Sequence, residues 1–165
     1  MDLNIKNAKY NDLKEIVEIY NQAIRTRHSI GFLNEFKVDE RTDWFMEHDQ
    51  GRYPILVARY DKKVVGWVSL SPYRKGRQAF NKAVEVSYFI HEDFQKMGIG
   101  TLLLKEILHI ARRLSYKNVV AIIFDINLGS VKLLEKFGFE RWGFLPDIAE
   151  IDGVKINHCY YGLKL

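Results

Sequence analysis

The sequence predicts an α/β domain with a mixed, mostly antiparallel central sheet and helices on both faces. The hydrophobic pattern changes between a period of about two and a period of about 3.6, in the order β-α-α-β-β-β-α-β-α-β-β. Residues 119–124 form a continuous apolar run, as expected for a strand covered on both faces. The last two strand patterns meet at Asp152-Gly153, which is typical of a hairpin turn.

The N-terminal third predicts one strand and two helices. Residues 3–5 alternate apolar and polar side chains, which indicates a short strand. Asn11 or Asp12 can cap the following helix, because a short polar side chain accepts a bond from a free backbone N–H. The apolar residues of that helix share one face: Leu13, Ile16, Val17, Tyr20 and Ile24. Residues 27–38 are expected to form a loop, and residues 39–49 a second helix with its aromatic side chains inward.

The rest of the chain predicts the remaining strands and two helices. In order, the expected elements are strands 55–60, 64–70 and 84–90, a helix at about 98–115, strand 119–124, a helix at about 129–137 and the final two strands. A polar, basic loop over residues 71–82 separates two of these strands. Gly138 is a natural C-terminal cap for the short helix.

Length and composition indicate one ordinary domain. The chain has 165 residues, of which 47% are apolar, and no stretch rich in Pro, Gly and Ser interrupts it, so a single domain over residues 1–165 is expected. Cys159 is the only cysteine, which excludes an intramolecular disulfide and a four-cysteine zinc site. No segment resembles a signal peptide or approaches the roughly 20 apolar residues of a membrane helix, so a soluble, cytoplasmic protein is expected.

The net charge of +4 has several interpretations. A basic protein can bind an anionic ligand or a nucleic acid, or its charges can simply be solvated. The densest basic group is Arg74-Lys75-Gly76-Arg77, and the other basic residues are scattered. A nucleic-acid module would need basic residues interleaved with exposed aromatics on one face, and this scatter does not supply them.

A glycine turn lies between an expected strand and an expected helix, in the run Gln95-Lys96-Met97-Gly98-Ile99-Gly100-Thr101. Glycines let backbone N–H groups approach a ligand, and the positive end of the following helix attracts phosphate oxygens. A plain tight turn is the alternative. The three-glycine dinucleotide fingerprint and the Gly-Lys-Ser/Thr ending of a nucleoside-triphosphate loop are both absent, so an anion cradle of another kind is left.

The string Gln-x-x-Gly-x-Gly resembles the pyrophosphate loop of the GCN5-related N-acetyltransferase superfamily. The segment from Asn127 to Phe139 resembles the second signature of that superfamily. The resemblance is nearest to phosphinothricin acetyltransferases, and it rests on Tyr53–Ala58, Gly66-Trp67, Tyr73-Arg74, Arg77–Phe80 and Glu85–Ile90. It implies the acyl-CoA N-acyltransferase fold, acetyl-CoA as the acetyl donor, no metal, and often a homodimer. The implied acceptor is phosphinothricin, methionine sulfoximine or a related amino-acid analogue.

Glu85 is the leading candidate for the catalytic base. Acyl transfer to an amine needs a neutral nitrogen and a group that takes its proton. Glu85 lies at the start of an otherwise apolar strand, where lost solvation would raise the pKa of its carboxyl. The resemblance implies the same role. The alternative is a carboxylate at a strand edge that faces solvent.

The resemblance also implies the contacts with coenzyme A. A ligand that lies along a strand can use unpaired backbone groups as an added strand would. The residues expected to bind the cofactor are Tyr88, Phe89 and Ile90 through their backbone, the loop residues Gln95, Lys96, Met97, Gly98, Ile99, Gly100 and Thr101, and Asn127. Asn127 can equally cap the helix that follows it.

The expected acceptor site combines two arginines with aromatic walls. The guanidinium groups of Arg74 and Arg77 suit a carboxylate or phosphinate, although two solvated loop arginines are the alternative. Phe32, Tyr73 and Phe80 are expected to wall the pocket, and packing in the core is the alternative for these aromatic residues.

The chain departs from the pattern of the superfamily at two positions. Leu134 stands where many members have a tyrosine that protonates the leaving thiolate, and Asn157 stands where an acidic residue is frequent. His158 and Tyr160 are nearby titratable candidates, and the acid for the thiolate therefore stays unassigned. Two other functions are left open. One is acetylation of another amine or a protein N-terminus, and the other is a CoA-binding module without turnover.

Overall fold

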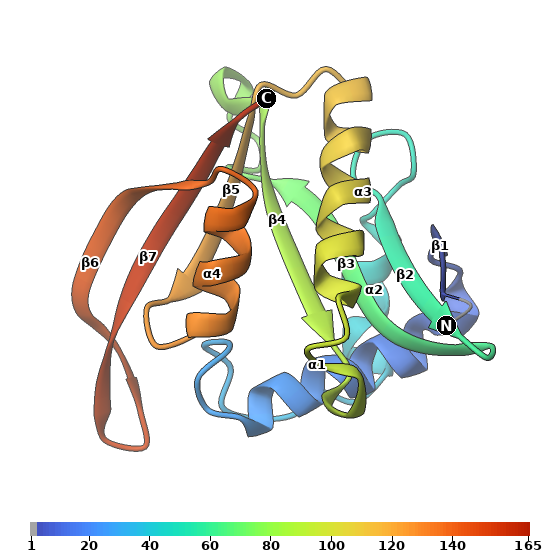
Figure 1. Cartoon of the computed structure of the whole chain (residues 1–165), viewed down its shortest axis with the longest axis horizontal. Coiled ribbons are helices and arrows are strands. Elements are labelled where there is room, and N and C mark those ends of the chain that lie inside the picture. Colours follow the sequence, from blue (N-terminus) through green and yellow to red (C-terminus); the bar gives the residue numbers. More distant parts are fainter. Residues whose placement is uncertain (1–2) are drawn as a thin grey trace.

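A computed structural model describes residues 3–165 and contains a seven-stranded sheet with helices on both faces (Figure 1). The strands are β1 (Leu3–Asn7), β2 (Ile55–Tyr60), β3 (Lys63–Pro72), β4 (Ala83–Ile90), β5 (Asn118–Phe124), β6 (Glu140–Ile151) and β7 (Val154–Lys164). The α-helices are α1 (Leu13–Arg25), α2 (Thr42–Met46), α3 (Ile99–Arg113) and α4 (Leu128–Lys136). The predicted order of elements and the predicted fold class are confirmed.

The strand order is β1-β2-β3-β4-β5-β7-β6, and only the β4–β5 pair is parallel. One core lies between the sheet and the helices α3 and α4, where Leu103, Ile107 and Leu134 are fully buried. A second core lies on the opposite face, where Ile16 and Tyr20 of α1 pack against the strands. The apolar stripes of α1 and α3 therefore decide which face each helix covers.

The start of α1 differs from the prediction. Asp12 precedes the helix but makes no side-chain cap to it. Its carboxylate instead accepts the backbone N–H of Lys9 at 2.9 Å and pairs with the guanidinium of Arg59 on β2. The charged partner from a distant strand competes successfully with the local N–H groups, because a charge-assisted bond is the stronger one.

The second helix is also shorter than the 39–49 range that was expected. A 3-10 turn at Asp39–Arg41 precedes α2, which ends at Met46. The ring Nδ1 of His48 bonds the carbonyl of Trp44 at 2.7 Å. That carbonyl is the acceptor that a helix continuing to residue 48 would use for its own backbone N–H.

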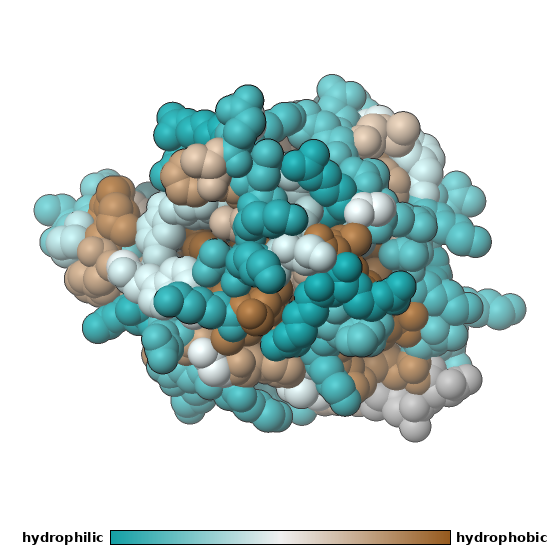
Figure 2. Space-filling model, turned by 90° about the horizontal axis from the view of Figure 1, so that it is seen from above, coloured by the Kyte–Doolittle hydropathy of each residue, from teal (hydrophilic) through white to brown (hydrophobic). Residues whose placement is uncertain are grey.

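The surface seen from above (Figure 2) is mostly hydrophilic. Figure 2 shows the end of the molecule that lies at the top of Figure 1, where polar side chains dominate and apolar ones show in small areas between them. A further apolar area lies at the left edge of this view, the side on which β6 lies in Figure 1. No helix within residues 3–165 has the length and apolar composition needed to cross a membrane.

Candidate active site

The sheet opens between its two parallel strands. Residues 83–85 of β4 pair with residues 118–120 of β5, and the ladder stops after the Glu85–Val120 pair. Beyond this point β4 stays paired with β3 only, and Figure 1 shows β4 and β5 diverging toward their C-terminal ends. The backbone of Val86–Ile90 therefore has no strand partner on its β5 side. A ligand placed there could bond to this edge as an added strand would.

A cavity of about 880 Å³ occupies this opening. It extends from Glu85 along β4 to the loop before α3, and α1, α4 and the 28–32 loop contribute to its walls. This volume lies in the usual range for ligand pockets, about 300–1,000 Å³. Of the predicted site residues, the cavity lining includes Glu85, Tyr88, Phe89, Ile90, Gln95, Lys96, Gly98, Ile99, Gly100, Thr101, Asn127 and Phe32.

The glycine turn forms the N-terminus of α3. Gly98 adopts φ of 83° at the N-cap position, a left-handed conformation that a side chain would strain. A Cβ on Gly100 would come within 3.1 Å of the Leu133 side chain, so this glycine lets α3 and α4 approach closely. The first N–H groups of an α-helix have no partner within the helix. Because those of α3 border the cavity, a tight turn and the predicted anion cradle use the same residues and do not exclude each other.

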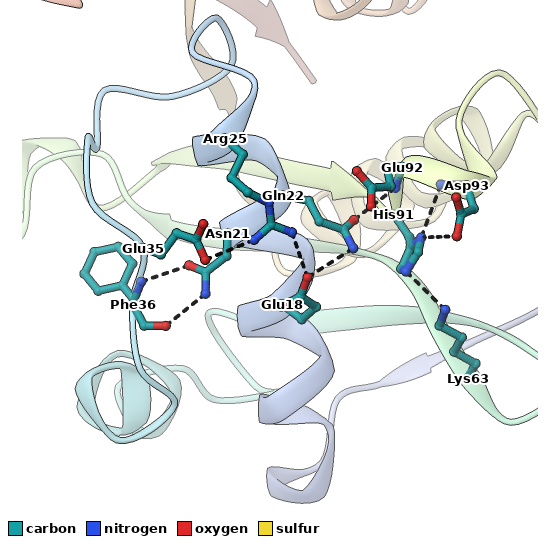
Figure 3. Close-up of polar contacts among 10 residues, drawn as sticks. All are labelled: Glu18, Asn21, Gln22, Arg25, Glu35, Phe36, Lys63, His91, Glu92 and Asp93. Atoms are coloured by element: carbon teal, nitrogen blue, oxygen red, sulfur yellow. Dashed lines mark hydrogen bonds and ion pairs between the residues drawn. The ribbon is translucent and has the colours of Figure 1, made fainter.

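Two groups of polar contacts fix residues 91–93, which lie between β4 and the glycine turn (Figure 3). The side-chain oxygen of Gln22 on α1 accepts the backbone N–H of Glu92 at 3.0 Å. The buried ring of His91 accepts the N–H of Asp93 at 3.3 Å through Nδ1, and its Nε2 lies 3.1 Å from Nζ of Lys63. The chain between β4 and the glycine turn is therefore fixed to α1 and to β3.

Asn127 performs the capping role that was one of its two interpretations. Its side-chain oxygen accepts the backbone N–H of Ser130 at 3.2 Å, at the start of α4. The same residue borders the cavity, so capping leaves it available to a ligand. Tyr88 reaches this turn from β4, and its hydroxyl donates to the carbonyl of Ser130 at 3.5 Å. Burial raises the pKa of Tyr88 to about 12, so its hydroxyl stays protonated at neutral pH.

Glu85 lies on a central strand, directly opposite Ser71 of β3 in the register. Its side chain borders the cavity, and burial raises the pKa of its carboxyl, while the charge of Arg74 opposes that shift. The interpretation of Glu85 as a solvated carboxylate at a sheet edge is therefore wrong, because β3 and β5 flank the strand on both sides. A carboxylate with a raised pKa is a better proton acceptor near neutrality than an exposed one.

Four predicted site residues lie outside the cavity lining. Arg74, Arg77 and Phe80 are exposed residues of the segment between β3 and β4, and Met97 is exposed in the glycine turn. The influence of Arg74 on Glu85 nevertheless shows that its charge lies within electrostatic range of the candidate base. The backbone of Met97 still belongs to the glycine turn, and the predicted anion cradle uses backbone N–H groups of that turn.

The two departures from the superfamily pattern also have a structural account. Leu134 is fully buried in the core that α3 and α4 share. Asn157 on β7 links the end of β5 to β6. Its side chain donates to Asp125, directly after β5, at 2.8 Å and accepts the backbone N–H of Asp147 on β6 at 2.9 Å. His158 borders the cavity, and burial lowers the pKa of its ring, which favours the neutral form.

The lining also includes residues that were not predicted as site residues, among them Tyr20, Arg41, Trp44 and Trp67. Tyr20 and Trp44 were expected to point inward as part of the core, and they do so while also bordering the cavity. A spacing of three residues puts Arg41 and Trp44 on one helical face, which was the available signal for the arginine. Within residues 3–165, no three His, Cys, Asp or Glu side chains are grouped as a metal site would require.

Comparison with known proteins agrees with this geometry. The sequence model of the acetyltransferase (GNAT) family matches residues 13–139. The predicted phosphinothricin acetyltransferase YwnH of Bacillus subtilis is 37% identical over 164 residues, which cover 99% of each chain. An L-methionine sulfoximine/L-methionine sulfone acetyltransferase of Pseudomonas aeruginosa is 32% identical over 168 residues, covering 100% of this chain and 96% of its own.

A solved structure gives the same result for the fold and the cofactor. The structure of yncA, a predicted acetyltransferase of Salmonella typhimurium with its cofactor acetyl-CoA, superposes with a TM-score of 0.94. The two chains are 28% identical, and the match covers 100% of this chain and 95% of that one. The predictions of the acyl-CoA N-acyltransferase fold and of an acetyl-CoA-dependent N-acetyltransferase are confirmed. The chain belongs to the GNAT acetyltransferase family.

Proposed function

We propose that this enzyme acetylates the amino group of a small amino-acid analogue of the phosphinothricin or methionine sulfoximine type, with Glu85 as the base. The observation that carries the mechanism is the position of Glu85. Its carboxylate has a raised pKa and borders the same cavity as the free edge of β4 and the N-terminus of α3. The acceptor class is supported by the names of the relatives, which match nearly the whole chain.

The reaction proceeds by direct attack. Glu85 takes a proton from the acceptor ammonium, and the freed lone pair attacks the thioester carbonyl carbon. A backbone N–H on the free edge of β4, at Tyr88 or Ile90, would hold the oxyanion, a contact typically worth about 3 kcal/mol in acyl transfer. The C–S bond then breaks as the second proton of the nitrogen passes to the departing sulfur, coenzyme A leaves as the thiol, and Glu85 releases the first proton to solvent. The residue that protonates the sulfur is unassigned.

The binding of the cofactor is expected to use three parts of the chain. The N–H groups of residues 98–101 would bind the diphosphate with help from the side chains of Gln95, Lys96 and Thr101. The edge of β4 at residues 88–90 would hold the pantetheine arm, and the side chain of Asn127 would contact it from α4. Near the acceptor, Arg74 supplies positive charge beside Glu85, while Arg77, Phe32 and Phe80 remain predicted contacts.

A homodimer and one domain over residues 1–165 complete the proposal. Four large apolar side chains are exposed on the β6–β7 hairpin, where a partner could cover them: Trp142, Phe144, Ile148 and Val154. Light scattering should give about twice the chain mass of 19.4 kDa. Ile148→Asp should shift this mass toward the monomer, whereas a monomeric wild-type protein would refute the dimer.

An amine panel tests the activity. Release of the thiol from acetyl-CoA would be followed with phosphinothricin, methionine sulfoximine, polyamines and a peptide with a free N-terminus. Phosphinothricin or methionine sulfoximine should have the highest kcat/KM, and turnover restricted to the other amines would refute the narrow assignment. Glu85→Gln should keep acetyl-CoA binding and lose most turnover. Equal turnover by this variant would remove Glu85 from the mechanism.

A further inference from the structure

Arg41 is a partly buried cation without an anionic partner among residues 3–165. Its guanidinium lies over three aromatic rings, with 4.4 Å to the centroid of Trp44, 5.0 Å to Phe36 and 5.1 Å to Tyr20. None of the ion pairs or side-chain hydrogen bonds within the described chain involves it. By contrast, the partly buried Arg59 pairs with the carboxylate of Asp12.

The aromatic rings satisfy only part of what a guanidinium can bind. Ring faces interact with the flat face of the cation, whereas its N–H donors point outward in its plane. Arg41 borders the cavity, so these donors have access to a ligand there. Burial lowers the pKa of Arg41, yet an arginine remains charged at any physiological pH. The planar, partly desolvated N–H donors of a guanidinium can bind both oxygens of a carboxylate, which is a bidentate interaction.

Arg41 and Glu85 border the same cavity, and this suggests which kind of ligand the cavity binds. The guanidinium of Arg41 lies 5.1 Å from the centroid of the Tyr20 ring. That ring packs edge-on against Phe89 of β4, the strand that carries Glu85, with ring centroids 4.9 Å apart. The cavity therefore holds both a cation and a candidate base. An α-amino acid carries a carboxylate that suits the cation and an amine that suits the base.

The surroundings of Arg41 are rigid. The buried side-chain amide of Asn21 makes two hydrogen bonds to the backbone of Phe36, each 2.9 Å long (Figure 3). Trp44 packs on Trp67 with ring centroids 5.5 Å apart, and the indole N–H of Trp67 donates to the carbonyl of Ile16 at 3.2 Å. The three rings around the guanidinium are thus held by α1 and β3 before any ligand arrives, which lowers the entropic cost of binding.

We propose that Arg41, in its cradle of Tyr20, Phe36 and Trp44, binds the α-carboxylate of the acceptor and selects amino acids over simple amines. This inference rests on the proposed function, because it names the group of the acceptor that the site recognises. It assigns the inner anion contact to Arg41 rather than to Arg74 or Arg77, which are exposed and lie outside the cavity lining.

A pair of acceptors that differ only in the carboxylate tests this assignment. L-methionine sulfone carries the group, and 3-(methylsulfonyl)propylamine lacks it. Arg41→Gln should raise the KM for L-methionine sulfone by about tenfold or more, and Arg41→Lys by less, since lysine keeps the charge but loses two-point geometry. The KM values for the amine and for acetyl-CoA should stay within about twofold of the wild type. Arg74→Gln and Arg77→Gln test the competing assignment and should change the preference for the carboxylate far less.

Each other outcome has a definite meaning. Equal losses with both acceptors in Arg41→Gln would mean that Arg41 only supports the aromatic cluster, and the inference would fail. A change of preference confined to Arg74→Gln or Arg77→Gln would transfer the carboxylate contact to the loop and overturn the inference while the proposed function stands. A wild-type enzyme that acetylates only the amine, or that is inactive with phosphinothricin and methionine sulfoximine as well as with both probes, would refute the amino-acid acceptor and the inference together.

Discussion

The side-chain amide of Asn21 bonds both backbone polar groups of Phe36, donating to its carbonyl and accepting its N–H at 2.9 Å each. These two bonds join α1 to the long loop before α2. Arg25 supports the same junction from the surface, since its guanidinium bridges Glu18 and Glu35 (Figure 3). The ring of Phe36 in turn stacks on the guanidinium of Arg41, which borders the cavity. The bonds between Asn21 and Phe36 therefore help to position a residue of the cavity wall, although they lie outside the cavity.

Asn21→Ala should lower the free energy of unfolding by about 1–3 kcal/mol, because two partly buried backbone groups lose their partner. It should also raise the KM for the acceptor, since Phe36 is released from its position. Urea unfolding and steady-state kinetics measure the two effects. Asn7→Ala is the matched control, because Asn7 bonds only the exposed side chain of Gln50, and it should change stability by less than about 0.5 kcal/mol. Equal effects of the two substitutions would contradict this account.

Glu85 should make stability depend on pH. Burial raises the pKa of its carboxyl above the ordinary value of 4.5, so the folded chain holds this proton to higher pH than the unfolded chain does. Its contribution to stability is therefore complete below about pH 4.5 and is lost as the pH rises through the folded pKa. The stability of Glu85→Gln relative to the wild type should increase between pH 4 and pH 7, as measured by urea unfolding at a series of pH values.

The same substitution should change the kinetics. In the wild type, kcat/KM should rise as Glu85 ionises, and Glu85→Gln should lose this acidic limb together with about a hundredfold or more of its activity. Glu140→Gln, at an exposed position on β6, should reproduce the wild-type profile. A Glu85→Gln enzyme with an unchanged acidic limb would show that another group is responsible for it.

Gly98→Ala should cost both stability and cofactor affinity. At φ of 83°, a Cβ costs about 1–2 kcal/mol, and rearrangement of the turn would displace the N–H groups at the start of α3. Gly153 at φ of 80° in the β6–β7 turn gives the control, because neither glycine has an atom within 4 Å of the added Cβ. Gly153→Ala should show a similar loss of stability with unchanged acetyl-CoA binding. If both variants bind acetyl-CoA as the wild type does, the turn is not the phosphate site.

Leu134→Ala should reduce stability by about 2–5 kcal/mol, because it removes a fully buried side chain from the core between α3 and α4. Thermal unfolding measures this effect. Leu128→Ala on the same helix should change stability by less than about 0.5 kcal/mol, since that side chain is 64% exposed. Comparable losses in the two variants would contradict the burial of Leu134.

Much of this molecule follows from local patterns. The alternation in the strands and the stripes of α1 and α3 predicted the order of elements, because periodicity depends only on neighbouring residues. Gly98 and the cap at Asn127 were visible for the same reason, since each serves the backbone beside it. Asp12 shows where this reasoning fails: a capping position was evident, but its partner on β2 was not.

The sequence alone therefore determined the fold class, the family resemblance, the position of the glycine turn and the candidate base. Only the tertiary structure decided that Glu85 loses solvent on a central strand, and that Arg41, which borders the same cavity, meets three aromatic rings while Arg74 and Arg77 remain outside. The reason is that solvation and charge depend on groups brought together from distant parts of the chain. Periodicity carries no information about which of those groups will meet.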